Sequence, residues 1–165
     1  ASSHGSTTAT NKNQMLHSSQ QKLMIKPDSQ LIQKLLQDEK DDRYRYLLKQ
    51  GTIHSVEAET HTIFVELKQI PSVLVIYRRP VERQANPEKV TLESRGLTQV
   101  PLLEGEEQLK HLILSQNQIK KIDHLVSLPN LQTLDLSSNK LVEINNFWLP
   151  GSSLDKLRTL ILAKN

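Results

Sequence analysis

The spacing of leucines in the second half of the chain constrains the fold more than any other feature. In "LQTLDLSSNKL" (131–141), fixed slots hold Leu131, Leu134, Leu136, Asn139 and Leu141. Twenty-two residues upstream the same slots hold Leu109, Leu112, Leu114, Asn117 and Ile119, and twenty-six residues downstream they hold Leu157, Leu160, Leu162 and Asn165. A degenerate earlier copy holds Val90, Leu92, Arg95 and Leu97. Such self-similarity is typical of repeat architectures.

Each copy is too short to bury its own leucines, so neighbouring copies must stack to make a core. We interpret one copy as a short strand, a turn closed by asparagine, and an irregular return segment. In the return segments an apolar residue recurs at every third position, from Leu97 to Leu109 and from Ile119 to Leu131, and only Glu106 interrupts this run. The predicted fold is an α/β solenoid of leucine-rich repeats with a parallel concave sheet, preceded by a small helical and β N-terminal region.

The recurring asparagines are predicted to form a structural ladder of Asn117, Asn139 and Asn165. An asparagine side chain carries both an acceptor and donors, so it can pair with backbone groups that a tight turn directs inward. A buried backbone group without a partner costs about 1 to 3 kcal/mol. We therefore expect Asn139→Leu to destabilise the fold, whereas Asn165, with no turn after it, is expected to tolerate the same change.

The N-terminal half divides by composition into three parts before the array. Residues 1–21 are rich in Ser, Thr, Asn and Gln and are expected to be a disordered tail. Residues 22–51 carry helical apolar spacing that stops at Gly51, and residues 52–79 alternate as a short β element. We expect this element to lean on the first repeat. Residues 80–165 form the array: a degenerate cap and about three repeats, truncated at the C-terminus.

Composition excludes several kinds of site. The chain has no cysteine, so disulfides and cysteine-based zinc sites are excluded. A formal charge of +3 without a basic stripe makes a nucleic-acid partner unlikely. The longest apolar run, "VLVIY", is too short to cross a bilayer, and the first residues lack the apolar core of a secretory signal. We therefore expect a soluble cytoplasmic protein without membrane contact.

No pattern of catalytic, cofactor-binding or metal-ligating residues is present, and we predict that the protein is not an enzyme. The five glycines are scattered, so no phosphate-binding loop can be built, and the six histidines match no ligand spacing. The acids of "EGEE" (104–107) are interpreted as a solvated convex face. In "YRRP", Arg78 and Arg79 are interpreted as solvated, with anion binding as the alternative.

The residues between the buried leucines are expected to point outward from the concave sheet, because side chains alternate along a strand. This mixed, mildly apolar column suits a protein partner better than a phosphate backbone. Its members are His111, Ile113, Ser115, Gln116, Thr133, Asp135, Ser137, Thr159 and Ile161. Trp148, the only tryptophan, lies in a return segment with four extra residues. Two interpretations of Trp148 are compatible with the sequence: its side chain is buried in the core, or it is exposed and anchors an interface.

The pattern "LKHLILSQNQIKKIDHLVSLPNLQTLDLSSNKL" resembles the short, 22-residue class of leucine-rich repeats. That class includes intracellular binding proteins such as phosphatase regulatory subunits, axonemal dynein light chain and a spliceosomal component. The segment before it is similar to the leucine-rich-repeat subunit of the tubulin polyglutamylase complex. The family elements Tyr-Arg-x-Pro, Ala-Asn-Pro and Arg-Gly-Leu-Thr match Tyr77–Pro80, Ala85–Pro87 and Arg95–Thr98.

This resemblance implies a non-catalytic scaffold or adaptor without a cofactor, which binds a protein partner on its repeats within a multi-subunit complex. The implied complex is a tubulin-modifying or ciliary assembly. The implied location is the cytoplasm, including the cytoskeleton, centrosome or cilium. A regulatory or targeting subunit of a phosphatase and an adaptor of a ribonucleoprotein particle are the alternatives.

Overall fold

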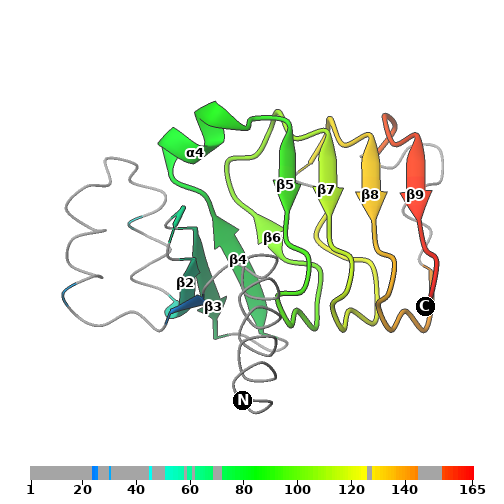
Figure 1. Cartoon of the computed structure of the whole chain (residues 1–165), viewed down its shortest axis with the longest axis horizontal. Helices are drawn as coiled ribbons and strands as arrows, with labels where there is room; N and C mark the ends of the chain where they lie inside the picture. Colours follow the sequence, from blue (N-terminus) through cyan, green and yellow to red (C-terminus); the bar gives the residue numbers. More distant parts are fainter. Residues whose placement is uncertain are drawn as a thin grey trace, which may run out of the picture.

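The computed structural model describes residues 24–25, 30, 45, 51–57, 59–60, 62–68, 72–125, 128–144 and 154–165. These residues form two sheets that lie side by side (Figure 1). The first has the order β1-β2-β3-β4-β6, with bounds Met24–Ile25, Thr52–Glu57, Ile63–Leu67, Val73–Tyr77 and Leu102–Leu103. The second has the order β5-β7-β8-β9, with bounds Lys89–Thr91, His111–Ile113, Thr133–Asp135 and Thr159–Ile161. The helix α4 (Pro80–Ala85) connects β4 to β5.

The second sheet is built from the repeated leucine slots. All three strand pairs are parallel, and Val90, Leu112, Leu134 and Leu160 occupy equivalent positions in the four strands. The longer, 26-residue step to the last copy therefore leaves the register unchanged. In every copy the residue before the asparagine slot has a positive φ, at Ser94, Gln116, Ser138 and Lys164. The repeat alignment predicted from the sequence, including the degenerate first copy, is confirmed.

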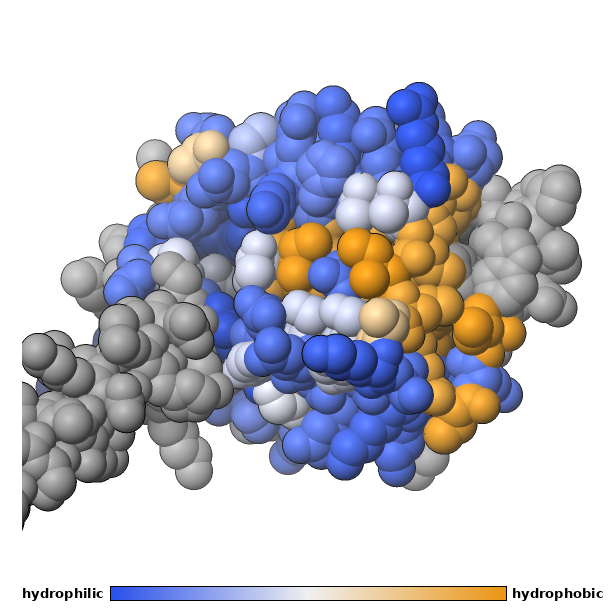
Figure 2. Space-filling model, turned by 45° about the vertical axis from the view of Figure 1, so that its right-hand side comes forward, coloured by the Kyte–Doolittle hydropathy of each residue, from blue (hydrophilic) through white to orange (hydrophobic). Residues whose placement is uncertain are grey.

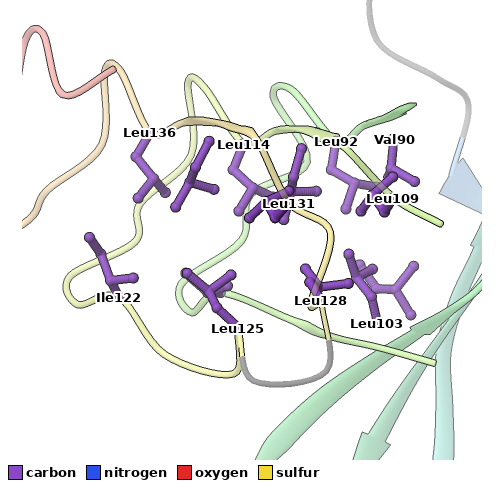
Figure 3. Packing of buried hydrophobic residues seen from close by; sticks show 14 of the residues in the cluster. Val90, Leu92, Leu103, Leu109, Leu114, Ile122, Leu125, Leu128, Leu131 and Leu136 are labelled. Atoms are coloured by element: carbon purple, nitrogen blue, oxygen red, sulfur yellow. The ribbon is translucent and has the colours of Figure 1, made fainter. Parts of the chain in front are cut away.

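The core of the array lies between the strands and the return segments (Figure 3). The strand side contributes Leu92, Leu109, Leu112, Leu114, Leu131, Leu134 and Leu136, and the return side contributes Leu103, Ile122, Leu125 and Leu128. Each fully buried leucine stabilises the fold by about 1.5 to 3 kcal/mol relative to an exposed one. Because each row packs against the next, the stacked copies bury leucines that one copy alone would expose.

The first sheet, hereafter the cap sheet, covers the first repeat. Its strands β2, β3 and β4 are antiparallel, whereas β4 pairs in parallel with β6, which belongs to the return segment of the first copy. Phe64 and Ile76 join the leucine core, while Val65, Val75 and their neighbours pack in a separate cluster. The β element thus lies against the first repeat and shares its core.

The N-terminal segments differ in part from their predictions. Met24 and Ile25 are extended and pair with Glu57 and Val56, although the sequence predicted a helical segment over 22–51. The open edge of β2 offers backbone hydrogen-bonding groups, and pairing with these competes with local helix propensity. Gln30 and Arg45 are helical. The predicted tail, residues 1–21, lies outside the described residues.

Candidate functional site

The outward side chains of the array align in rows across the strands, because the register is preserved from β7 to β9. One row holds His111, Thr133 and Thr159, and the next holds Ile113, Asp135 and Ile161. We call these six residues the strand face. Ile161 is 38% exposed, and the other five range from half-buried to exposed. In Figure 2, two hydrophobic patches flank a hydrophilic one near the centre of this side of the molecule.

The carboxylate of Asp135 is held in place within the strand face. Its Oδ1 accepts a hydrogen bond from the backbone N–H of Ser137 at 2.9 Å and another from the Ser137 hydroxyl at 2.7 Å. Its Oδ2 has no hydrogen-bond partner in the part of the chain that the structure describes. Ser137 therefore acts as a positioning residue for Asp135, which remains half-buried.

The other residues predicted to line the partner-binding column differ in exposure. Gln116 is exposed, and its Oε1 accepts a hydrogen bond from Ser94 Oγ at 2.9 Å. Ser115 is only 6% exposed, so its prediction as a surface residue is wrong. Ser115 lies just beyond the end of β7, and its carbonyl accepts a backbone hydrogen bond from the Ser94 N–H of the preceding copy. Trp148 lies outside the described residues.

The asparagine slots form a series of hydrogen bonds behind the strand face. Asn117 accepts from the N–H groups of Arg95 and Leu97 at 2.9 and 3.1 Å. Its Nδ2 donates to the carbonyls of Leu92, Leu114 and Ser115. Asn139 accepts from the Ile119 N–H at 3.0 Å, and its Nδ2 donates to the carbonyls of Leu114, Leu136 and Ser137.

Each of these asparagines also forms hydrogen bonds with the backbone of the copy that precedes it in the sequence. Asn165 accepts from the Leu141 N–H of the preceding copy and donates to the Leu136 carbonyl, so its side chain has backbone partners as Asn117 and Asn139 do. The reason given for its expected insensitivity is therefore wrong. The bond from Leu141 is exposed, and the part-buried Leu136 carbonyl also accepts from Asn139, so the expected cost of losing the Asn165 side chain is still small.

The first copy has no preceding copy, and Arg95 takes the asparagine slot there. Its Nε lies 2.7 Å from Glu57 Oε1 on strand β2, and the two side chains are 4% and 6% exposed. Where Asn117 and Asn139 contact the backbone of an earlier copy, Arg95 contacts the cap sheet. The departure from asparagine thus follows from the different neighbour.

A second buried ion pair joins the cap sheet to the array. Arg78 donates from Nε and Nη2 to the two carboxylate oxygens of Glu106, each at 2.7 Å, and the side chains are 9% and 1% exposed. The interpretation of Glu106 as part of a solvated convex face is therefore wrong. Arg78 is also not available to an external anion, because its guanidinium nitrogens Nε and Nη2 already donate to the carboxylate of Glu106.

The described residues contain no group of three or more His, Asp or Glu side chains placed to hold a metal ion. None of the helices described is long and apolar enough to cross a membrane. The charged side chains buried in this part of the chain are used in the two ion pairs, Arg78–Glu106 and Arg95–Glu57. The strand face, in contrast, brings outward side chains of three successive copies together in register.

Comparisons with known proteins agree with the repeat register. Residues 107–148 match the family model described as "Leucine Rich repeats (2 copies)". The human protein "Leucine-rich repeat-containing protein 49" is 30% identical over 76 residues, which are 46% of this chain and 11% of that protein. The chain therefore spans only a small part of the length of that relative. No solved structure matches. Both matches support a leucine-rich repeat protein.

Proposed function

We propose that this chain is a non-catalytic scaffold whose repeats form a solenoid and bind a protein partner on the strand face, the concave side. Leucine-rich repeat domains generally mediate protein–protein interaction. The observation that carries the proposal is the row Ile113–Asp135–Ile161, in which two partly or largely exposed isoleucines lie in register on either side of a carboxylate. Exposed apolar side chains next to a few polar ones are typical of the surfaces through which proteins bind one another.

The absence of an enzymatic role belongs to the same proposal. Catalysis needs a nucleophile, base or acid that is positioned but not consumed by structural contacts. In the described residues, Glu57 and Glu106 are each paired with an arginine. Asp135 stands between two isoleucines without a neighbouring base in its row. These contacts support a binding role over a catalytic one.

The finer proposal is membership of a tubulin polyglutamylase or ciliary complex, with a cytoplasmic or cytoskeletal location. It rests on the three sequence elements that resemble that family. Tyr77–Pro80 and Arg95–Thr98 contain the arginines that join the cap sheet to the array. The resemblance therefore concerns residues that build this joint, and it supports a shared architecture at the start of the repeats.

Affinity capture tests the proposed function. The purified chain, an Ile113→Asp/Ile161→Asp variant and a Val142→Asp control are immobilised, and proteins bound from cell extract are identified by mass spectrometry. Val142 is 79% exposed and lies outside the strand face, so its variant controls for a new surface carboxylate. Thermal melts establish that all three chains are folded.

We expect the same specific proteins on the wild type and the control, and their loss from the strand-face variant. Polyglutamylase subunits among them would support the finer proposal, whereas a phosphatase catalytic subunit or ribonucleoprotein components would favour the alternatives. Equal capture by all three chains would contradict binding through the strand face.

A further inference from the structure

The strand face has one feature that specifies the chemistry of its partner, and this inference rests on the proposed function. Asp135 is the only carboxylate among the six residues of the strand face. It lies in register between Ile113 and Ile161, one strand away on each side. With strands about 4.8 Å apart, the two isoleucines stand roughly 10 Å apart with the carboxylate between them.

A partner that contacts both isoleucines must also cover Asp135. Covering removes water from the carboxylate, and a desolvated carboxylate is strongly unfavourable without a compensating positive charge. Ser137 supplies two hydrogen bonds, both to Oδ1 and both from uncharged groups. Within the described chain Oδ2 has no hydrogen bond and no cation pairs with Asp135. The missing charge must therefore come from the partner.

We infer that the strand face binds a protein segment that presents one lysine or arginine between apolar residues. The cationic group pairs with Asp135, and the flanking apolar side chains contact Ile113 and Ile161. Both basic residues fit, because each carries an aliphatic stem that can lie along an isoleucine. An acidic segment is disfavoured, since it would bring a second negative charge to the same uncompensated carboxylate.

A random dodecapeptide phage library, selected on the purified chain, tests this inference. Selected peptides are synthesised, and their affinities are measured by fluorescence anisotropy. Asp135→Asn is the key variant, because its side-chain oxygen can still accept from Ser137 while the charge is removed. Asp123→Asn is the matched control, since Asp123 is an exposed carboxylate in a return segment. Ile161→Asp reports whether a peptide binds on the strand face at all.

We expect the selected peptides to share a lysine or arginine flanked by apolar residues. Asp135→Asn should weaken their binding at least about tenfold, as for a desolvated charge-assisted contact, and Asp123→Asn should leave it unchanged. When the basic residue of a peptide is replaced by glutamate, the peptide should no longer bind the wild type. The same glutamate peptide should bind the Asp135→Lys variant, in which the charge of the protein is reversed.

The outcomes separate this inference from the proposed function. One outcome would overturn the inference and leave the strand face as a binding site. In this outcome the selected peptides lack a basic residue and bind Asp135→Asn with the same affinity as the wild type, but they bind Ile161→Asp more weakly. Peptides whose affinity is unchanged by both Ile161→Asp and Asp135→Asn would count against the strand face itself, and so against both.

Discussion

Replacing Asn117 by leucine tests how the asparagine slots stabilise the array. Leucine is similar in size and more apolar, so a purely hydrophobic account predicts little loss. The hydrogen bonds predict otherwise. Without the Asn117 side chain, the N–H groups of Arg95 and Leu97 and the carbonyl of Leu92 lose their only hydrogen-bond partner within the described residues.

The expected magnitude follows from which backbone groups keep another partner. The Leu114 carbonyl still accepts from Asn139 at 2.9 Å, and the Ser115 carbonyl still accepts from the Ser94 N–H at 3.2 Å. Three backbone groups are therefore left unpaired in Asn117→Leu. The two buried ones, the Leu97 N–H and the Leu92 carbonyl, at about 1 to 3 kcal/mol each give about 2 to 6 kcal/mol, and the part-buried Arg95 N–H adds less.

Asn139→Leu provides the internal comparison. In that variant the Leu114 carbonyl keeps Asn117, the Leu136 carbonyl keeps Asn165, and the Ser137 carbonyl keeps the Gln116 N–H. Only the N–H of the buried Ile119 loses its partner, so the expected cost is about 1 to 3 kcal/mol. For Asn165→Leu we expect about 1 kcal/mol or less, because the exposed groups can bond to water.

Urea denaturation followed by circular dichroism measures the three variants beside the wild type. A surface control is Asn130→Leu, whose hydrogen bonds to Glu107 and Lys156 are exposed. We expect the urea concentration at the unfolding midpoint to fall most in Asn117→Leu, less in Asn139→Leu and least in Asn165→Leu. The dependence of the unfolding free energy on urea concentration should stay the same in all of them. Equal losses at Asn117 and Asn139, or a more stable leucine variant at either, would refute the reasoning from shared partners.

Three further substitutions test the joint between the cap sheet and the array, each by chemical denaturation. Glu106→Leu should lower the free energy of unfolding by about 3 to 5 kcal/mol, because Arg78 stays buried without its carboxylate partner. The double variant Arg78→Met/Glu106→Leu should lower it much less, and equal losses in the two variants would contradict the buried ion pair. Arg95→Asn should destabilise although it restores the common residue of its slot, since Glu57 would remain buried; a neutral effect would count against this ion pair. Gly105→Ala should lower the free energy of unfolding by about 1 kcal/mol or more, because Gly105 has a φ of +71°, which alanine adopts only with strain; unchanged stability would contradict that strain.

The sequence contains enough information to align the repeats because their period is a local property. The slots of Leu112, Leu134 and Leu160 could be assigned from spacing alone, and the strands occur at those slots. Even the degenerate copy at Val90 was recognisable, since its paired apolar residues match. The outward positions of β7, β8 and β9 follow from the same alternation.

The joint could not be predicted in this way, because its partners are distant in the sequence. Arg78 and Glu106 are 28 residues apart, and Arg95 and Glu57 are 38 apart. "EGEE" alone has the composition of a solvated segment. The available signals were the interruption of the apolar run at Glu106 and the replacement of asparagine at Arg95. Each marked a position where a charged side chain had a specific buried partner.

Site-specific photocrosslinking tests the central claim, that the strand face binds a protein partner, most directly. Benzoylphenylalanine replaces Thr133, at the centre of the strand face, or Lys121, whose exposed side chain lies in a return segment. After irradiation in cell extract, adducts are separated by size and identified by mass spectrometry. The account predicts discrete protein adducts from position 133 and none from position 121. Adducts from position 121 alone, or the same adducts from both positions, would contradict it.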